Sequence, residues 1–209
     1  MSAIDEHNVD ILEPPFYIPG GKTQGIVQAI RSGDWMHTTD VWLYRDYPEL
    51  QILFQQRDLA SPTYAGKLDC SVAGYLMAGE TGKKGGVREV AEEFGVNLKE
   101  DDLTMVGRRF NAMLDHRGRE RRIVANKHIV RWNFELDTLK LNPEEVRAVF
   151  WVPAVSMKDI EDGSSVEVYG IDSKGKKISK LISKSDFAYN LDDYYFRIAE
   201  QIQLIEQKL

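Results

Sequence analysis

The sequence predicts an α/β (α+β) fold with strands and a few helices around one core. Segments rich in β-branched and aromatic residues alternate with shorter segments of helical periodicity. A chain of 209 residues with 43% hydrophobic content is long enough to bury one full core, or at most two small ones. No internal repeat or low-complexity tract is present, so a single mixed sandwich is the simplest architecture.

Composition narrows the classes of function. The net charge of -6 provides no basic surface for a nucleic-acid duplex, so we expect no such partner. Cys70 is the only cysteine, which excludes an intrachain disulfide and favours a reducing compartment. The acidic N-terminus has no apolar run of signal-peptide length, and no run of about 18 apolar residues occurs elsewhere. We therefore expect a soluble cytoplasmic protein without a membrane partner.

The first third of the chain contains an arm, a helix and a hairpin in this order. Residues 1–21 hold three of the seven prolines, which predicts an extended arm with few contacts. Helical spacing of apolar residues before Gly33 predicts a short helix at 26–33. The segments at 38–46 and 49–57 are rich in apolar and β-branched residues, and the turn between them indicates a hairpin.

The remaining elements follow from the same two periodicities. Strands are expected at 67–76, 103–113, 120–135 and 147–152, helices at 83–94 and 154–160, and a hairpin at 166–182. In the terminal segment, Tyr195, Ile198, Ile202 and Ile205 fall on one helical face. We divide the chain into an arm and short helix at 1–34, a core at 35–160, and a hairpin and helix at 161–209 packed on the same domain.

Three glutamates in the predicted helix at 83–94 form the first functional signal. Glu89, Glu92 and Glu93 are spaced i, i+3 and i+4, so their carboxylates project from one side of a helix and repel one another. A hard divalent cation with oxygen ligands removes that repulsion. On its own the cluster is more often a solvated acidic face. Its surroundings decide between the two interpretations.

Those surroundings carry a motif over residues 74–96. The motif comprises Gly74, Glu80, Arg88, Glu89, Val90, Glu92, Glu93, Gly95 and Val96 at fixed spacings. It resembles the Nudix box, and the resemblance to the Nudix hydrolase family extends from about Trp35 to Pro153. The resemblance implies a Nudix-type α/β/α sandwich with a mixed β-sheet. It also implies a loop, helix, loop that binds magnesium, or manganese in its place, and the diphosphate of a small-molecule substrate.

The resemblance also implies roles for single residues. Glu92 and Glu93 match the principal metal ligands, and Glu89 matches a third carboxylate that binds metal or deprotonates water. The main-chain carbonyl of Ala73 matches a further ligand, and Glu145 lies where many members keep another ligand or base; an exposed loop glutamate is an equally good interpretation. The residues expected to support the box are Gly74, Glu80, Arg88 and Gly95. One departure is that Gly85 and Gly86 replace better helix formers, each costing up to ~1 kcal/mol in a helix interior.

Within the family, residues 37–80 resemble the isopentenyl diphosphate isomerase-like branch. His37 and Arg57 match that branch and, together with Tyr75, are expected to bind substrate. The isomerase also needs a cysteine, a histidine and an acidic pair. The corresponding positions here hold Ala73, Tyr75, Ala125 and Lys127. Allylic isomerisation needs a proton donor and an acceptor on opposite faces of the substrate, and this sequence lacks both.

The sequence therefore favours a magnesium-dependent Nudix pyrophosphohydrolase on an isomerase-like scaffold. Its substrate would be a nucleoside diphosphate linked to another moiety, or a related organic diphosphate. The alternative is a Nudix domain kept for binding or regulation with little turnover, and an isomerase is third. Dimerisation is common in the family, so a homodimer that exchanges the N-terminal arm is a further hypothesis.

Overall fold

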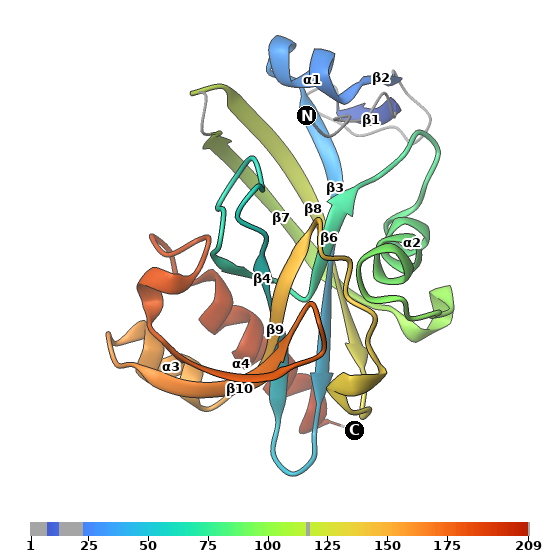
Figure 1. Cartoon of the computed structure of the whole chain (residues 1–209). Helices are drawn as coiled ribbons and strands as arrows, with labels where there is room; N and C mark the ends of the chain where they lie inside the picture. The colour runs from blue at the N-terminus through green and yellow to red at the C-terminus, as the bar shows by residue number, and fades with distance from the viewer. Residues whose placement is uncertain (1–7, 13–22, 116–117, 209) are drawn as a thin grey trace.

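The computed structural model describes residues 8–12, 23–115 and 118–208 (Figure 1). Their strands are β1 (Asn8–Leu12), β2 (Thr23–Gly25), β3 (Trp35–Arg45), β4 (Gln51–Arg57), β5 (Leu68–Asp69), β6 (Val72–Tyr75), β7 (Thr104–Leu114), β8 (Glu120–Arg131), β9 (Val146–Pro153), β10 (Val166–Asp172) and β11 (Lys177–Ile182). Their helices are α1 (Ile26–Ser32), α2 (Gly82–Phe94), α3 (Ser156–Glu161) and α4 (Tyr194–Glu206). Across these residues, no helix has both the length and the apolar character needed to cross a membrane.

The strands form a mixed sheet with β3 at its centre. Strand β3 runs parallel to β8 and antiparallel to β6, and its end pairs with β4. The sheet continues from β4 through β9 and β10 to β11, while β7 pairs with β8 on the other side. Apart from the β3–β8 pair, the strands pair antiparallel.

Alternate side chains of the central strands fill two separate apolar layers. Val41 and Leu43 of β3 pack with Val90 and Phe94 of α2 on one face. Trp42 of β3 points the other way, into the layer covered by helices α3 and α4. Figure 1 shows α2 on one side of the sheet and α3 with α4 on the other. This arrangement is the expected α/β/α sandwich.

Most of the expected elements are present, with two differences. The strand expected at 67–76 is interrupted at Cys70 and Ser71, where the Ser71 hydroxyl bonds the main chain of β3 and β4. The arm at 1–21 was expected to make few contacts, yet residues 8–12 form β1 and pair with β2 and β3. Backbone pairing of this kind leaves little signal in a proline-rich sequence. The rest of the arm lies outside the described residues.

The C-terminal segment packs on the same body as the rest of the chain. Strand β10 pairs with β9, which joins the terminal hairpin to the central sheet. Tyr195, Ile198 and Ile202 of α4 are buried in the same apolar layer as Trp42, and Ile205 packs against it. The helical face predicted from the sequence is therefore the face that packs. It brings the segment before α4 to the edge of the cavity described below.

Candidate active site

Helix α2 begins and ends at residues that suit these positions. The Thr81 hydroxyl accepts a hydrogen bond from the Lys84 amide at 3.1 Å, which caps the first turn. Gly95 follows the last turn in the left-handed conformation, with φ of 67°, which glycine adopts without a Cβ clash. The box therefore begins and ends its helix through local chemistry.

The glycines of α2 let the helix lie close to the sheet. A Cβ on Gly86 would lie 2.6 Å from a Leu103 methyl and 3.0 Å from Val41, and a Cβ on Gly85 would lie 2.2 Å from Leu76. The Thr39 hydroxyl donates to the Gly82 carbonyl at 3.0 Å, which fixes the first turn on β3. These glycines lower the helix propensity of α2, but they allow the helix to pack closely against the sheet beneath the glutamates.

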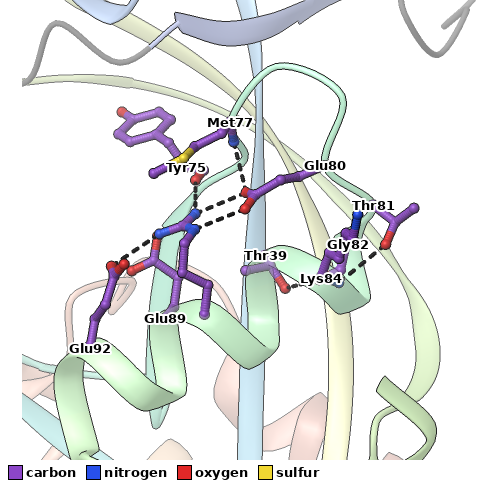
Figure 2. Close-up of polar contacts among 10 residues, drawn as sticks. Thr39, Tyr75, Met77, Glu80, Thr81, Gly82, Lys84, Glu89 and Glu92 are labelled. Atoms are coloured by element: carbon purple, nitrogen blue, oxygen red, sulfur yellow. Dashed lines mark hydrogen bonds and ion pairs between the residues drawn. The ribbon is translucent and has the colours of Figure 1, made fainter. Parts of the chain in front are cut away.

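Arg88 joins the loop of the box to its helix through hydrogen bonds to Tyr75 and Glu80, both of which are labelled in Figure 2. Its Nε donates to Glu80 Oε1 at 2.9 Å and one terminal nitrogen donates to Glu80 Oε2 at 3.0 Å, so the pair is bidentate. The same terminal nitrogen donates to the Tyr75 carbonyl at 2.9 Å. Although burial acts to raise the pKa of Glu80, the hydrogen bonds from Arg88 and the Met77 amide lower it overall. Glu80 and Arg88 therefore brace the loop against α2.

The carboxylate of Glu89 occupies the space that a side chain at position 74 would fill. A Cβ on Gly74 would lie 1.9 Å from Glu89 Oε1. Glu89 is only 8% exposed, and burial raises the pKa of its carboxyl to about 7 despite the hydrogen bond from Arg88. The Glu92 and Glu145 carboxylates raise that pKa further. Because Gly74 has no side chain, the buried carboxylate of Glu89 can lie directly against strand β6.

Glu93 is the most deeply buried of the three glutamates. Its Oε2 is buried and has no hydrogen-bond partner among the residues that the structure describes. Burial raises the pKa of Glu93 well above its ordinary value, and the neighbouring Glu89 and Glu145 raise it further. A hydrogen bond with the main chain of Ala73 and the charge of Arg57 act in the opposite direction. An unpartnered buried carboxylate oxygen among other carboxylates fits a hard cation.

Glu92 differs from its neighbours because its side chain is 52% exposed. Its Oε2 accepts from an Arg88 nitrogen at 3.1 Å, and the same nitrogen donates to Glu89 Oε1 at 2.8 Å. Arg88 therefore bridges the two carboxylates. Within the described ranges, no three acidic, histidine or cysteine side chains are already grouped around one point. A cation held by all three glutamates therefore requires the exposed Glu92 side chain to turn away from Arg88.

Glu145 lies beside the box although it is far from it in sequence. Its main-chain carbonyl accepts from the Asp58 amide at 2.9 Å, and its carboxylate accepts from the Asn142 side chain at 3.1 Å. The carboxylate lines the same cavity as Glu89 and Glu92 and raises the pKa of both Glu89 and Glu93. Glu145 therefore lies at the same cavity as Glu89 and Glu92.

Glu89, Glu92 and Glu145 line a cavity of about 340 Å³, and Glu93 is not among its lining residues. Ala73, Gly74 and Tyr75 line it from β6, Arg57 from the end of β4, and Arg88, Glu89 and Glu92 from α2. Thr38 and Asp40 line it from β3. Of the residues expected to bind substrate, Arg57 and Tyr75 therefore lie at the cavity.

His37 does not lie there, contrary to the expectation. Thr38 and Asp40 point into the cavity, so the alternation of β3 turns His37 to the opposite face. The His37 side chain is 2% exposed and lies beside the Asn126 amide, with 3.4 Å between the nitrogens. Burial, together with the nearby Arg108, lowers its pKa to about 4, so the ring is neutral near pH 7. His37 is a buried residue of the sheet rather than a residue of the cavity wall.

Two positions that would carry isomerase chemistry present methyl groups to the cavity. Ala73 and Ala125 both line it. Tyr75 lines it as well, and its hydroxyl accepts from Arg121 at 3.0 Å. Cys70 does not replace the missing cysteine, because it is 1% exposed and packs in the apolar layer below. The strand is interrupted at Ser71, which breaks the regular alternation of side chains between Cys70 and Ala73, so Ala73 packs against that same layer.

Sequence reasoning missed part of the cavity. Its lining includes Asp40, Asp69, Tyr64, Arg109 and Tyr189, from elements that are far apart in sequence. The Tyr194 hydroxyl donates to Asp40 at 3.1 Å, and the Tyr195 hydroxyl donates to Asp69 at 3.0 Å. Burial, followed by the charge of Asp69, raises the pKa of Asp40 to about 7. Acidic residues at interior positions of strand-like segments were the signal that could have identified Asp40 and Asp69.

The fold and the site define the class to which the chain belongs. The NUDIX domain model matches residues 36–167, more than half of the chain. The chain belongs to the Nudix family and is, by family, a Nudix hydrolase. Enzymes of this family act on small molecules and generally use a divalent metal.

Relatives agree with this assignment. An uncharacterised Nudix hydrolase of Clostridium acetobutylicum is 26% identical over 200 residues, which are 92% of this chain and 95% of that protein. Nudix hydrolase 3 of Arabidopsis thaliana is 28% identical over 129 residues, covering 59% of this chain and 16% of that protein. The isomerase-like branch stays a prediction.

Solved structures show the same fold. The MutT protein of Methanosarcina mazei superposes with a TM-score of 0.54 at 16% identity, over 81% of this chain and 95% of that chain. A MutT/nudix family protein of Enterococcus faecalis superposes with a TM-score of 0.53 at 15% identity, over 94% of this chain and 65% of that chain. At these identities the likeness concerns the fold alone.

Proposed function

We propose that the chain is a magnesium-dependent pyrophosphohydrolase. Its substrate would be a nucleoside diphosphate linked to another moiety, or a related organic diphosphate. The observation that carries this proposal is the buried Oε2 of Glu93, which has no hydrogen-bond partner among the described residues and whose pKa is raised by Glu89 and Glu145. Those two carboxylates line a cavity that Arg57 also lines. An unpartnered carboxylate oxygen is costly to bury unless a cation or proton meets it.

The donor set fits magnesium, and manganese would be accepted in its place. Glu89, Glu92 and Glu93 would hold the ion through carboxylate oxygens, together with the Ala73 carbonyl. A bound divalent ion would polarise phosphoryl oxygens and lower the pKa of a coordinated water. Arg57 at the end of β4 would meet the negative charge of the diphosphate, since its guanidinium faces the cavity 3.6 Å from Asp69.

Glu145 lies outside this donor set and would take a proton from the attacking water, whereas Glu89 would do so only where it is not a ligand of the ion. Burial raises the pKa of Glu89 to about 7, which suits a base at neutral pH. Glu145 is exposed and lines the cavity, so it can exchange protons with solvent. Glu89→Gln and Glu145→Gln distinguish them, because loss of the base removes the acidic limb of the pH–rate profile.

A binding or regulatory module with little turnover is the alternative function. It requires the same metal and substrate contacts, so only turnover separates the two. An isomerase is disfavoured, because Ala73 and Ala125 present methyl groups where a proton donor and acceptor are needed. The homodimer and the cytoplasmic location stay predictions.

The test is product release from a panel of nucleoside diphosphate derivatives and isoprenoid diphosphates, with and without magnesium. We expect turnover only with metal, and a decrease of at least about 100-fold in Glu92→Gln. Glu144→Gln is the matched control, because Glu144 is an exposed neighbour of Glu145 outside the cavity lining. Binding of nucleotide without any release would establish the binding module instead.

A further inference from the structure

Strands β7 and β8 line part of the cavity with side chains that the proposed metal site does not use. Asn111 and Met113 come from β7, and Arg121 and Ile123 come from β8. Met113 is opposite Arg121 in the register of the two strands, and Asn111 is opposite Ile123. Asn111 and Arg121 are therefore diagonal neighbours on the face that meets the cavity. This part of the wall combines two polar side chains with two apolar ones.

Arg121 places a buried positive charge in this part of the wall. The residue is 6% exposed, and its Nε is buried without a hydrogen-bond partner among the described residues. That Nε lies 3.6 Å from Asp115 Oδ2, which accepts a hydrogen bond from Arg119 Nε at 2.8 Å. One carboxylate is thus shared by two guanidinium groups, which leaves one positive charge in excess among the three side chains. A buried charge of this kind is unfavourable unless an anion compensates it.

Asn111 adds an unused donor beside that charge. Its Nδ2 is buried and makes no hydrogen bond within the part of the chain that the structure describes. A buried amide without a partner lowers the stability of a fold, so the fold alone gives no reason for it. The arginine side chain has donors and no acceptor, and an amide nitrogen is likewise a donor. A ligand that matches both groups accepts hydrogen bonds and carries negative charge.

Tyr75 separates Arg121 from the motif on α2. The Tyr75 carbonyl accepts from Arg88 at 2.9 Å, and the Tyr75 hydroxyl accepts from Arg121 at 3.0 Å. The two guanidinium groups therefore contact opposite ends of one tyrosine. Because Arg88 also bonds Glu89 and Glu92, the diphosphate is expected at the Arg88 end. An anion at Arg121 thus belongs to another part of the ligand.

We propose that Arg121 and Asn111 bind an oxyanion, a carboxylate or a phosphate, that the substrate carries apart from its diphosphate. The planar guanidinium matches the oxygens of either group, and Asn111 Nδ2 supplies a further donor. The substrate is therefore a diphosphate compound with a second anionic group. This inference rests on the proposed function and adds one requirement to its substrate.

The first experiment needs no catalysis and is made in EDTA. Sodium phosphate and, separately, sodium acetate are titrated into ¹⁵N-labelled protein, and the Nε–H signal of Arg121 is followed by nuclear magnetic resonance. We expect a saturable shift with at least one anion, and binding at least about tenfold weaker in Asn111→Leu. Arg122→Gln is the matched control, because Arg122 is the next residue, lies outside the cavity lining and pairs with Glu120.

Urea unfolding of Asn111→Leu separates a role in binding from a role in the fold. Leucine replaces a buried amide nitrogen that has no partner in the described ranges. We therefore expect the free energy of unfolding to equal or exceed that of the wild type. A lower value would show that the fold uses the amide and would remove Asn111 from the proposed site.

Two pairs of substrates identify the oxyanion. NADPH differs from NADH by one phosphate, and UDP-glucuronate differs from UDP-glucose by one carboxylate. With magnesium present, we expect kcat/KM of the wild type to favour the anionic member of one pair by at least about tenfold. Arg121→Gln and Asn111→Leu should reduce this preference mainly through KM, whereas Arg122→Gln should keep it.

The outcomes separate this inference from the proposed function. Equal kcat/KM within both pairs would overturn the inference while hydrolysis stands. The same holds if neither anion binds in EDTA, or if the wild type and Asn111→Leu bind both anions equally. If no diphosphate is cleaved but an anion still shifts the Arg121 signal and binds more weakly to Asn111→Leu, the proposed function fails and the oxyanion site remains.

Discussion

At the scale of single residues, the relation between Gly74 and Glu89 defines the site. Residue 74 has no side chain, and the Glu89 carboxylate lies in the space that a Cβ would need. The sequence motif gave both residues and predicted their proximity to one metal site. It did not predict which of the two makes room for the other, because that depends on the path of β6 beside α2.

The Gly74→Ala variant tests this relation. The added methyl would lie 1.9 Å from Glu89 Oε1, so the carboxylate must move by roughly 1 Å or more. We expect turnover to decrease by about 100-fold, because a displacement of that size disrupts a catalytic arrangement. Gly25→Ala is the control, as a Cβ there meets nothing within 4 Å. Wild-type turnover in Gly74→Ala would contradict the proposed role of Glu89.

The raised pKa of Glu89 predicts a pH-dependent stability difference. Its folded-state pKa of about 7 exceeds the ordinary 4.5, so between these values the folded state binds more protons than the unfolded state. The contribution of Glu89 to stability therefore decreases as pH rises from about 4.5 to 7. Glu89→Gln lacks this contribution.

We expect Glu89→Gln to match the wild type near pH 4.5 and to exceed it by about 2 kcal/mol at pH 8 in EDTA. Urea unfolding at a series of pH values gives the free energy of unfolding of each protein. Excess magnesium should reverse the order at pH 8, because the ion stabilises the wild type. Two parallel pH profiles in EDTA would show that the pKa of Glu89 is ordinary.

At the scale of elements, helix α2 shows what the sequence could and could not predict. Its position, cap and terminal glycine follow from local chemistry, and the predicted helix at 83–94 matches Gly82–Phe94. The packing role of Gly85 and Gly86 could not be predicted. The side chains that leave no room for a Cβ there, Leu76, Val41 and Leu103, come from other segments of the chain. The position of His37 could not be predicted for a related reason. Periodicity in a strand that is buried on both faces does not indicate which face meets the cavity.

The glycine face of α2 predicts the outcome of Gly86→Ala. Alanine raises helix propensity by up to ~1 kcal/mol, but its Cβ would lie 2.6 Å from Leu103 and 3.0 Å from Val41. We expect a net loss of about 1–2 kcal/mol in the free energy of unfolding. Lys84→Ala, on the exposed face of the same helix, should change it by less than about 0.5 kcal/mol. A gain in stability for Gly86→Ala would mean that α2 lies farther from the sheet.

At the scale of the whole molecule, the cavity combines residues from both ends of the chain. Its glutamates on α2 come from a contiguous motif and could be predicted. Arg109 and Asp40 meet through the pairing of β7, β8 and β3, and Tyr189 joins them from the segment before α4. The C-terminal segment was expected to pack on the core, but its contribution to the cavity has no local signature. The site therefore depends on α4 being part of one cooperative unit.

Ile202→Ala tests that dependence. Ile202 is fully buried in the apolar layer under α4, so its truncation should cost about 2–4 kcal/mol. Leu204→Ala, on the same helix and 57% exposed, should cost less than about 1 kcal/mol. Urea unfolding followed by far-UV circular dichroism and by tryptophan fluorescence should give coincident transitions in both variants. Separate transitions would mean that α4 unfolds independently of the site.

The proposed function requires Glu89, Glu92 and Glu93 to hold a divalent cation together. A titration with Mn²⁺, in which the electron paramagnetic resonance signal reports the free ion, measures this binding. We expect saturable binding to the wild type and to Glu144→Gln, displacement by excess magnesium, and at least about tenfold weaker binding to Glu93→Gln. Equal binding of Mn²⁺ to Glu93→Gln and to the wild type would contradict the claim.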